Sequence, residues 1–144
     1  MRDTGGRRLT PACVPRLKSA MKITAIAFIG YPVTEIARAC AFYEGVLGLK
    51  RGDVWEDKDK AWIEYDIGGG TLAISNMSQD MWKPSSDGPG VALEVDDFAD
   101  AVARLRAAGV KFHLEPTDSP VCRMAVVGDP DGNSLVIHKR NPPA

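Results

Sequence analysis

The chain has 144 residues, a size that suits one ordinary domain or two small modules with a shared core and excludes a large multidomain assembly. Hydrophobic residues make up 44% and charged residues 26%, which places the sequence in the globular range and excludes a fibrous or fully disordered chain. Eighteen Lys and Arg residues nearly balance 19 Asp and Glu residues, and the formal net charge of -1 argues against a nucleic acid or an anionic membrane as partner.

The first twenty residues are the least organised part of the sequence. They carry five basic residues, one acidic residue and two prolines without helical or strand periodicity, so we predict a disordered extension over 1–20. A basic transit peptide is the alternative, and Met21 is a candidate natural start. We expect the folded domain to span 21–140.

Cysteine spacing and hydropathy bear on the compartment. The three cysteines, Cys13, Cys40 and Cys122, are far apart and form no CxxC pair, which argues against a disulfide framework or a structural zinc site and favours the cytoplasm. No apolar run approaches the ~20 residues of a membrane span, so we expect no membrane association.

A repeat with an offset of 62 or 63 residues divides the remaining sequence. The aligned segments are Val33–Ala41 with Val95–Ala103 and Thr71–Ile74 with Ser134–Ile137. The repeat predicts two modules, over 22–76 and 88–138, joined by a linker over 77–89 that is rich in Ser, Pro, Gly and Asp.

Each module begins with a predicted strand and helix. In the first, a strand over 23–29 precedes a helix whose apolar positions follow helical spacing, with Thr34 as its N-cap and Gly48 at its end. In the second, a strand over 91–95 precedes a helix capped by Asp96 and ended by Gly109.

Predicted strand hairpins follow each helix. A turn at Gly68–Gly69 places Ile63 opposite Ile74, Tyr65 opposite Leu72 and Glu64 opposite Ala73. In the second module the turn is Asp129–Asn133. There we predict one face with Met124, Val126, Leu135 and Ile137, and the other with Arg123, Ala125, Val127, Val136 and His138.

Three segments in this order resemble a known superfamily. They are AFYEGVLGL at 41–49, VDDFADAVARLRAAGV at 95–110 and DPDGNSLVI at 129–137, and they are similar to the vicinal oxygen chelate superfamily of glyoxalase I, extradiol dioxygenases, fosfomycin-resistance and bleomycin-resistance proteins. The resemblance covers about residues 22–140 and implies an α+β fold, in which two βαβββ modules form a curled mixed sheet around a cleft with the helices outside.

Metal-using members of that superfamily hold a divalent ion in the cleft with His, Gln or Glu side chains. The positions that correspond here, counted from the motifs, are Phe28, Ala73, Gly90 and Val136. None of these side chains carries an atom that binds a metal ion. We therefore expect no metal and no other cofactor, and the chemistry that depends on such an ion is disfavoured.

Other residues of the predicted cleft are candidates for ligand contact. The predicted cleft lining is Phe28, Trp62, Glu64, Ala73, Glu94, Arg123, Val136 and His138. His138 is a candidate because histidine is the residue type best suited to proton transfer near neutral pH, and a buried Glu64 or Glu94 would suit a general base. The alternatives are that His138 points to solvent and that a glutamate is a solvated charge or a partner of Arg123.

Tryptophans in predicted loops supply a further signal. Trp55 and the Met81–Trp82 pair are placed to form rims or lids over a cleft, where flat aromatic walls suit a planar or apolar ligand. A subunit contact is the competing interpretation, because an apolar linker exposes surface that needs a cover.

Three functional hypotheses follow. The leading one is a metal-free, small-molecule-binding protein that resembles bleomycin-resistance proteins and forms a homodimer. The second is an enzyme: either glyoxalase- or dioxygenase-like with a metal on the displaced ligands Glu64, Glu94 and His138, or a metal-free isomerase or lyase that uses a carboxylate and His138 for proton transfer. The third is a non-catalytic interaction module.

Overall fold

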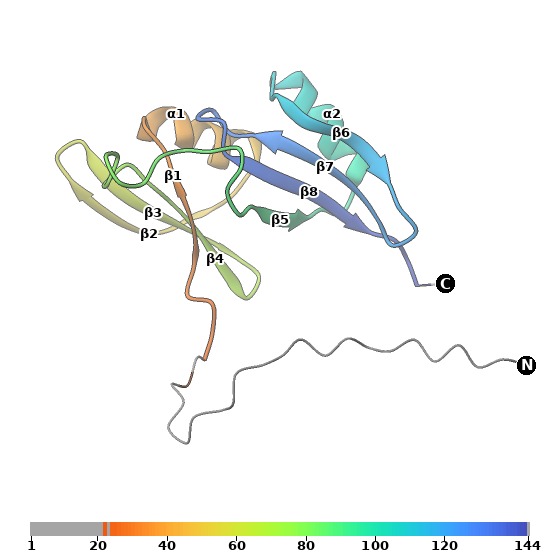
Figure 1. Cartoon of the computed structure of the whole chain (residues 1–144), viewed down its shortest axis with the longest axis horizontal. Helices are drawn as coiled ribbons and strands as arrows, with labels where there is room; N and C mark the ends of the chain where they lie inside the picture. Colours follow the sequence, from red (N-terminus) through yellow and green to blue (C-terminus); the bar gives the residue numbers. More distant parts are fainter. Residues whose placement is uncertain (1–21, 23, 144) are drawn as a thin grey trace, which may run out of the picture.

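In the described part of the chain, eight strands form two separate four-stranded sheets, one from each half (Figure 1). The computed structural model describes Lys22 and residues 24–143, so the predicted extension over 1–20 lies outside the described residues. The first half contains β1 (Ile29–Pro32), α1 (Ile36–Cys40), the π-helical turn η1 (Ala41–Val46), β2 (Arg51–Asp57), β3 (Lys60–Ile67) and β4 (Gly70–Ser75). The second half contains β5 (Val91–Glu94), α2 (Phe98–Ala107), β6 (Phe112–Asp118), β7 (Cys122–Gly128) and β8 (Ser134–Arg140).

The two sheets repeat one topology. Their strand orders are β1-β4-β3-β2 and β5-β8-β7-β6, with a parallel pair at β1–β4 and at β5–β8 and antiparallel pairs elsewhere. Each parallel pair is joined by a connection that contains the helix of its module, as a βαβββ unit requires. The predicted α+β class and the two βαβββ modules are confirmed, and the two sheets do not close into a barrel.

The first strand begins later than predicted. β1 starts at Ile29, which pairs with Leu72, and among the described residues before it none forms a ladder pair. β4 begins at Gly70, immediately after the glycine turn, and in this parallel register it offers no backbone groups to residues that precede 27.

Both predicted helix caps differ by one residue from the structure. Glu35 occupies the N-cap of α1, while the Thr34 hydroxyl donates instead to Asp131 Oδ1 at 2.5 Å in the second module. Asp97 caps α2 by accepting from the backbone N–H of Asp100 at 3.0 Å. Gly48 lies just beyond η1 with a φ of +72°, a left-handed conformation that glycine adopts without strain.

The predicted register of the first hairpin is confirmed, and that of the second is wrong. Ile63 pairs with Ile74 and Glu64 with Ala73, around Gly68–Gly69. In the second hairpin the pairs are Met124 with His138, Ala125 with Ile137, Val126 with Val136, and Val127 with Leu135. Five residues, 129–133, lie outside that ladder because the Asp129 carboxylate accepts from the backbone N–H groups of Asp131 and Asn133. The assignment of β7 to the two faces is therefore reversed.

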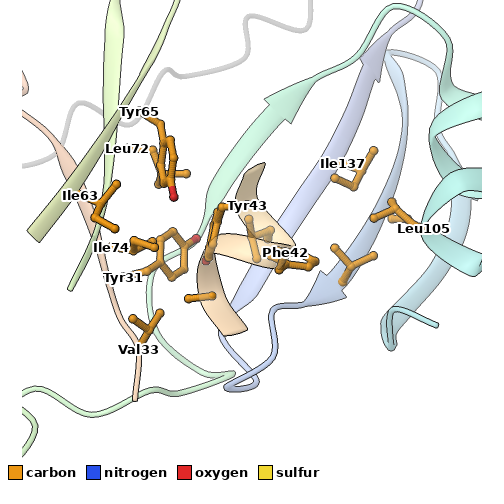
Figure 2. Close-up of a cluster of buried hydrophobic side chains, with 14 of the residues drawn as sticks. Tyr31, Val33, Phe42, Tyr43, Ile63, Tyr65, Leu72, Ile74, Leu105 and Ile137 are labelled. Atoms are coloured by element: carbon orange, nitrogen blue, oxygen red, sulfur yellow. The ribbon is translucent and has the colours of Figure 1, made fainter. Parts of the chain in front are cut away.

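A single core joins the helix-covered faces of both sheets. Figure 2 shows Tyr31, Ile63, Tyr65, Leu72 and Ile74 of the first sheet near Tyr43, with Phe42, Leu105 and Ile137 on the side of the second module. All belong to one contiguous cluster of buried side chains. Each sheet thus has one helix-covered face in this core and one open face outside it.

Polar contacts also hold the modules together. The Tyr31 hydroxyl donates to the carbonyl of Ser134 at 2.8 Å and accepts from the N–H of Val91 at 2.7 Å. Asn133 Nδ2 donates to the carbonyl of Pro32 at 2.7 Å in a buried position. Among the described residues, no helix is long and apolar enough to cross a membrane.

Candidate ligand-binding faces

The open face of the first sheet carries four of the predicted cleft residues. We define the open face of the first sheet as Phe28, Gly30, Trp55, Trp62, Glu64, Asp66 and Ala73. The ladder pairs Trp55 with Trp62, Glu64 with Ala73 and Ala73 with Gly30, and paired residues share a face. Phe28 precedes Gly30 by two residues, and its ring contacts Trp62.

Aromatic rings form a wall on this face. The rings of Phe28 and Trp62 meet edge to face with centroids 4.9 Å apart, and Trp62 stacks with Trp82 at 6.4 Å. Trp82 lies over Gly30 so closely that a Cβ added there would be 2.8 Å from Cη2 of its ring. The glycine therefore makes room for the tryptophan, and the three aromatic side chains come together from the segment before β1, from β3 and from the linker.

The linker that supplies Trp82 is tied to the body of the protein. The backbone N–H of Trp82 donates to the carbonyl of Ser78 at 2.8 Å, and Gln79 Nε2 donates to the carbonyl of Thr34 at 3.1 Å. Further along, the N–H of Ser85 donates to Asn133 Oδ1 at 3.1 Å. These bonds hold the aromatic wall in place before any ligand arrives.

Glu64 is the acidic group beside this wall. The Trp62 indole N–H donates to Glu64 Oε1 at 2.9 Å, and within the described range no Lys, Arg or His forms an ion pair with this carboxylate. Ala73, its neighbour across the ladder, is fully buried and forms the floor of the face.

The open face of the second sheet is mainly apolar. We define the open face of the second sheet as Ala92, Glu94, Leu114, Met124, Val126, Val136 and His138. The ladder pairs Val126 with both Leu114 and Val136, and Val136 with Ala92. Leu114 is 43% exposed, so part of this apolar surface is accessible to a ligand or a partner.

One polar pair lies at the edge of this second face. His138 Nδ1 and Glu94 Oε2 are 2.5 Å apart, and Glu94 Oε1 accepts from the backbone N–H of Arg140 at 2.7 Å. The hydrogen bond from the Arg140 backbone is the main cause that lowers the pKa of Glu94 below its usual value, and the hydrogen bond with His138 is the second cause. With Glu94 ionised and bound to Nδ1, the His138 ring is oriented and its Nε2 is left for other contacts.

Arg123 does not belong to either open face, which corrects the prediction. It pairs with Lys139, on the helix-covered side, and its guanidinium lies 4.8 Å from the centroid of the Phe98 ring of α2. Its Nε also donates to Asp118 Oδ1 at 2.8 Å. The alternative in which a cleft glutamate pairs with Arg123 is therefore not found among the described residues, and the cause is the shifted register of the second hairpin.

The residues that the motifs place at the predicted metal-ligand positions do not fit a metal ion. Phe28, Ala73, Gly90 and Val136 have no ligating atoms, and a Cβ added at Gly90 would lie 3.1 Å from the carbonyl oxygen of Ser134. Within the described part of the chain, no three His, Cys, Asp or Glu side chains form a metal-binding group. Within one chain, Glu64 accordingly does not join Glu94 and His138 in one site.

A groove that no sequence pattern indicates lies on the helix-covered side. It has a volume of about 610 Å³ and lies between β1 and η1 of the first module and β5 and α2 of the second. Its apolar lining includes Ile29, Leu47, Leu49, Leu93, Val95 and Leu105. No tryptophan lines this groove, so ligand binding there is distinguishable from binding at the open face of the first sheet.

Comparisons with known proteins agree with this architecture. The family model described as glyoxalase/bleomycin resistance protein/dioxygenase superfamily matches residues 25–137. Among solved structures, TnmS3, an antibiotic binding protein from Streptomyces sp. CB03234, is 25% identical with a TM-score of 0.69, over 85% of this chain and 100% of that one. A glyoxalase/bleomycin resistance protein from the same organism is 26% identical with a TM-score of 0.63, over 78% and 98% of the two chains.

A more distant similarity concerns the fold alone. A superfamily member from Sphaerobacter thermophilus DSM 20745 is 23% identical with a TM-score of 0.66, over 81% of this chain and 98% of that one. The comparison with curated proteins found no match.

Proposed function

Because this chain belongs to the glyoxalase/bleomycin resistance protein/dioxygenase superfamily, we propose that it is a ligand-binding protein that takes a flat small molecule between two open faces and needs no metal ion. The observation that carries the proposal is the wall of Phe28, Trp62 and Trp82 beside Glu64. Rigid aromatic rings offer a large contact area to a planar ligand at a small entropic cost.

The opposite wall of the site comes from a second copy of the chain. In one chain the two open faces lie outside a shared core, and among the described residues no hydrogen bond or ion pair joins them. Phe28 is 45% exposed and Trp55 is 52% exposed, which is apolar surface that a partner would cover. A homodimer would place the aromatic face of one copy against the apolar face of its partner, twice by symmetry.

Two further points support binding rather than metal-dependent chemistry. The positions of the superfamily's metal ligands hold Phe28, Ala73, Gly90 and Val136, none of which can bind an ion. The similar protein TnmS3 is described as antibiotic binding, so a fold of this kind serves ligand capture in at least one relative. We also place the protein in a reducing compartment such as the cytoplasm, since Cys40 and Cys122 are free thiols.

A complementation experiment tests the site and the dimer together. Trp62→Ala removes part of the aromatic wall, and Val136→Asp puts a charge in the apolar wall; Val121→Asp, at an exposed position off both faces, is the matched control. The probes are the neutral molecule N-methylacridone and the cation N-methylacridinium, two planar compounds of nearly equal shape. Their binding is followed by calorimetry and by quenching of tryptophan fluorescence.

We expect each single variant to lose binding as a homodimer, because both of its sites are damaged. A heterodimer of the two variants, purified through different affinity tags, contains one site with both walls intact and recovers one ligand per dimer. Failure of the heterodimer to recover binding, or a monomeric mass by light scattering, contradicts the proposal. Absence of binding of both probes by the wild type favours the interaction-module hypothesis instead.

Proton transfer is a second candidate function, favoured by one observation. The 2.5 Å contact between His138 Nδ1 and Glu94 Oε2 orients an imidazole on an open face, as a general base requires. The enzyme hypothesis predicts that the protein catalyses deuterium exchange into an activated C–H, tested by NMR with dihydroxyacetone in D₂O. Loss of exchange in His138→Gln supports proton transfer, whereas a wild-type rate equal to the buffer rate counts against it for this probe.

A further inference from the structure

The open face of the first sheet combines an aromatic wall with a carboxylate that forms no ion pair with any described residue. The Trp62 indole N–H holds Glu64 through Oε1 at 2.9 Å, while Glu64 Oε2 has no hydrogen-bond partner among the described residues. Asp66 lies two residues along the same face, where it accepts from the Thr71 hydroxyl at 3.2 Å and forms no ion pair with a described residue.

The distribution of charge along this face is uneven. The alternation of β3 places one cation, Lys60, on the same side as Glu64, with Asp57 as its ladder partner. Four residues of extended strand separate Lys60 from Glu64, which corresponds to about 13 Å. Arg123, the cation expected beside these carboxylates, lies on the helix-covered face of the other sheet. Glu64 and Asp66 therefore lie at one end of this face without an ion-pair partner among the described residues.

From this juxtaposition we propose that the ligand of this face is a planar aromatic cation, which stacks on Trp62 and Trp82 and places its positive charge at Glu64. The inference rests on the proposed ligand-binding function and names the chemical class of the ligand. Two attractions act on the same charge: the negative faces of the indole rings and the carboxylate. A neutral ligand of the same shape receives only the stacking, and an anionic ligand would be repelled by Glu64 and Asp66.

The test compares two probes of nearly equal shape and different charge. N-methylacridinium is a planar cation, and N-methylacridone is its neutral counterpart; affinities for the full-length protein are measured by isothermal calorimetry. We expect the cation to bind about three- to tenfold more tightly than the neutral probe. We also expect this preference to fall as the salt concentration rises, because the charges lie near solvent.

A matched pair of variants locates the source of the preference. Glu64→Gln removes the charge and keeps an oxygen that accepts from the Trp62 indole, so the aromatic wall is retained. Glu56→Gln makes the same change in β2, where pairing with the core residue Ala61 places position 56 on the opposite face. Glu64→Gln should weaken acridinium binding to the level of acridone without changing acridone binding, and Glu56→Gln should change neither.

The outcomes separate this inference from the function on which it rests. Equal affinities for both probes in the wild type, or an equal loss of both in Glu64→Gln, overturn the cation preference and leave ligand binding intact. Absence of binding of either probe, with a folded protein by circular dichroism, overturns both. Retention of the preference in Glu64→Gln would also overturn the inference, because the charge at Glu64 would then not be its source.

Discussion

The Tyr43 hydroxyl donates to the carboxylate of Asp129 at 2.9 Å, and this contact joins the π-helical turn of the first module to the last hairpin of the second. Both residues are buried, and the same carboxylate also accepts from Asn133 Nδ2 at 2.8 Å. Burial raises the pKa of Asp129 above its usual value, although these donors act in the opposite direction. The contact between the modules thus depends on a buried carboxyl group that needs hydrogen bonds from its neighbours.

Removal of the Tyr43 hydroxyl should destabilise the protein. We expect Tyr43→Phe to lower the free energy of unfolding by about 1–3 kcal/mol, because it leaves a buried acceptor without one of its donors. Urea denaturation followed by circular dichroism measures the loss. Tyr65→Phe is the matched control: Tyr65 is equally buried, but its hydroxyl makes only a 3.9 Å contact with Cys40 Sγ. An equal loss in the control would show that the Asp129 contact is not the cause.

The raised pKa of Asp129 predicts a pH dependence of stability. A folded-state pKa above the unfolded value means that the folded protein binds this proton more readily. The contribution of Asp129 to stability is therefore fully present below its unfolded pKa and is lost as pH rises through its folded pKa. Relative to Asp129→Asn, which cannot titrate, wild type should gain stability as pH falls from 7 toward about 4.

The measurement is the difference in unfolding free energy between wild type and Asp129→Asn at each pH. Other acids titrate in both proteins and cancel in the difference, provided that they lie far from Asp129. A difference that is constant with pH, or that moves in favour of Asp129→Asn as the pH falls, would contradict a raised pKa.

A methyl group at position 30 should disturb the aromatic wall. In Gly30→Ala the new Cβ would lie 2.8 Å from Trp82 Cη2, so the indole ring must move. We expect a changed near-UV circular dichroism signal from the Trp62–Trp82 pair and a weaker affinity for planar probes. Gly45→Ala is the control, because a Cβ at position 45 has no neighbour within 4 Å. An unchanged tryptophan signal in Gly30→Ala would show that Trp82 does not lie over Gly30 in solution.

Arg123 should matter for stability and not for ligand binding. Its guanidinium packs over the Phe98 ring, on the helix-covered side of the second sheet. We expect Arg123→Ala to cost about 0.5–1 kcal/mol of stability, the usual value for an exposed cation–π contact, with the affinity for N-methylacridinium unchanged. A large loss of affinity would place Arg123 back in the ligand site, as the sequence had predicted.

The placement of the cleft residues shows where prediction from sequence ends. Glu64 and Trp62 were assigned correctly to a shared face, because two residues at Gly68–Gly69 define the turn and therefore the register. Arg123 was assigned to the wrong face, because its turn contains five residues whose folding depends on the buried Asp129 carboxylate. A shift of one residue in a strand moves every side chain of that strand to the other face of the sheet. An error of one residue in the turn therefore placed Arg123 on the wrong face.

The sequence by itself determined the two modules, their helices and the turn at Gly68–Gly69, since periodicity and turn chemistry act between residues that are close along the chain. It also determined which positions lack metal-binding side chains. Only the tertiary structure decided that Trp82 of the linker stacks on Trp62, that Tyr43 meets Asp129, and that the open faces lie apart. These contacts join residues distant in the sequence, and packing of the whole core selects them, so no local pattern encodes them.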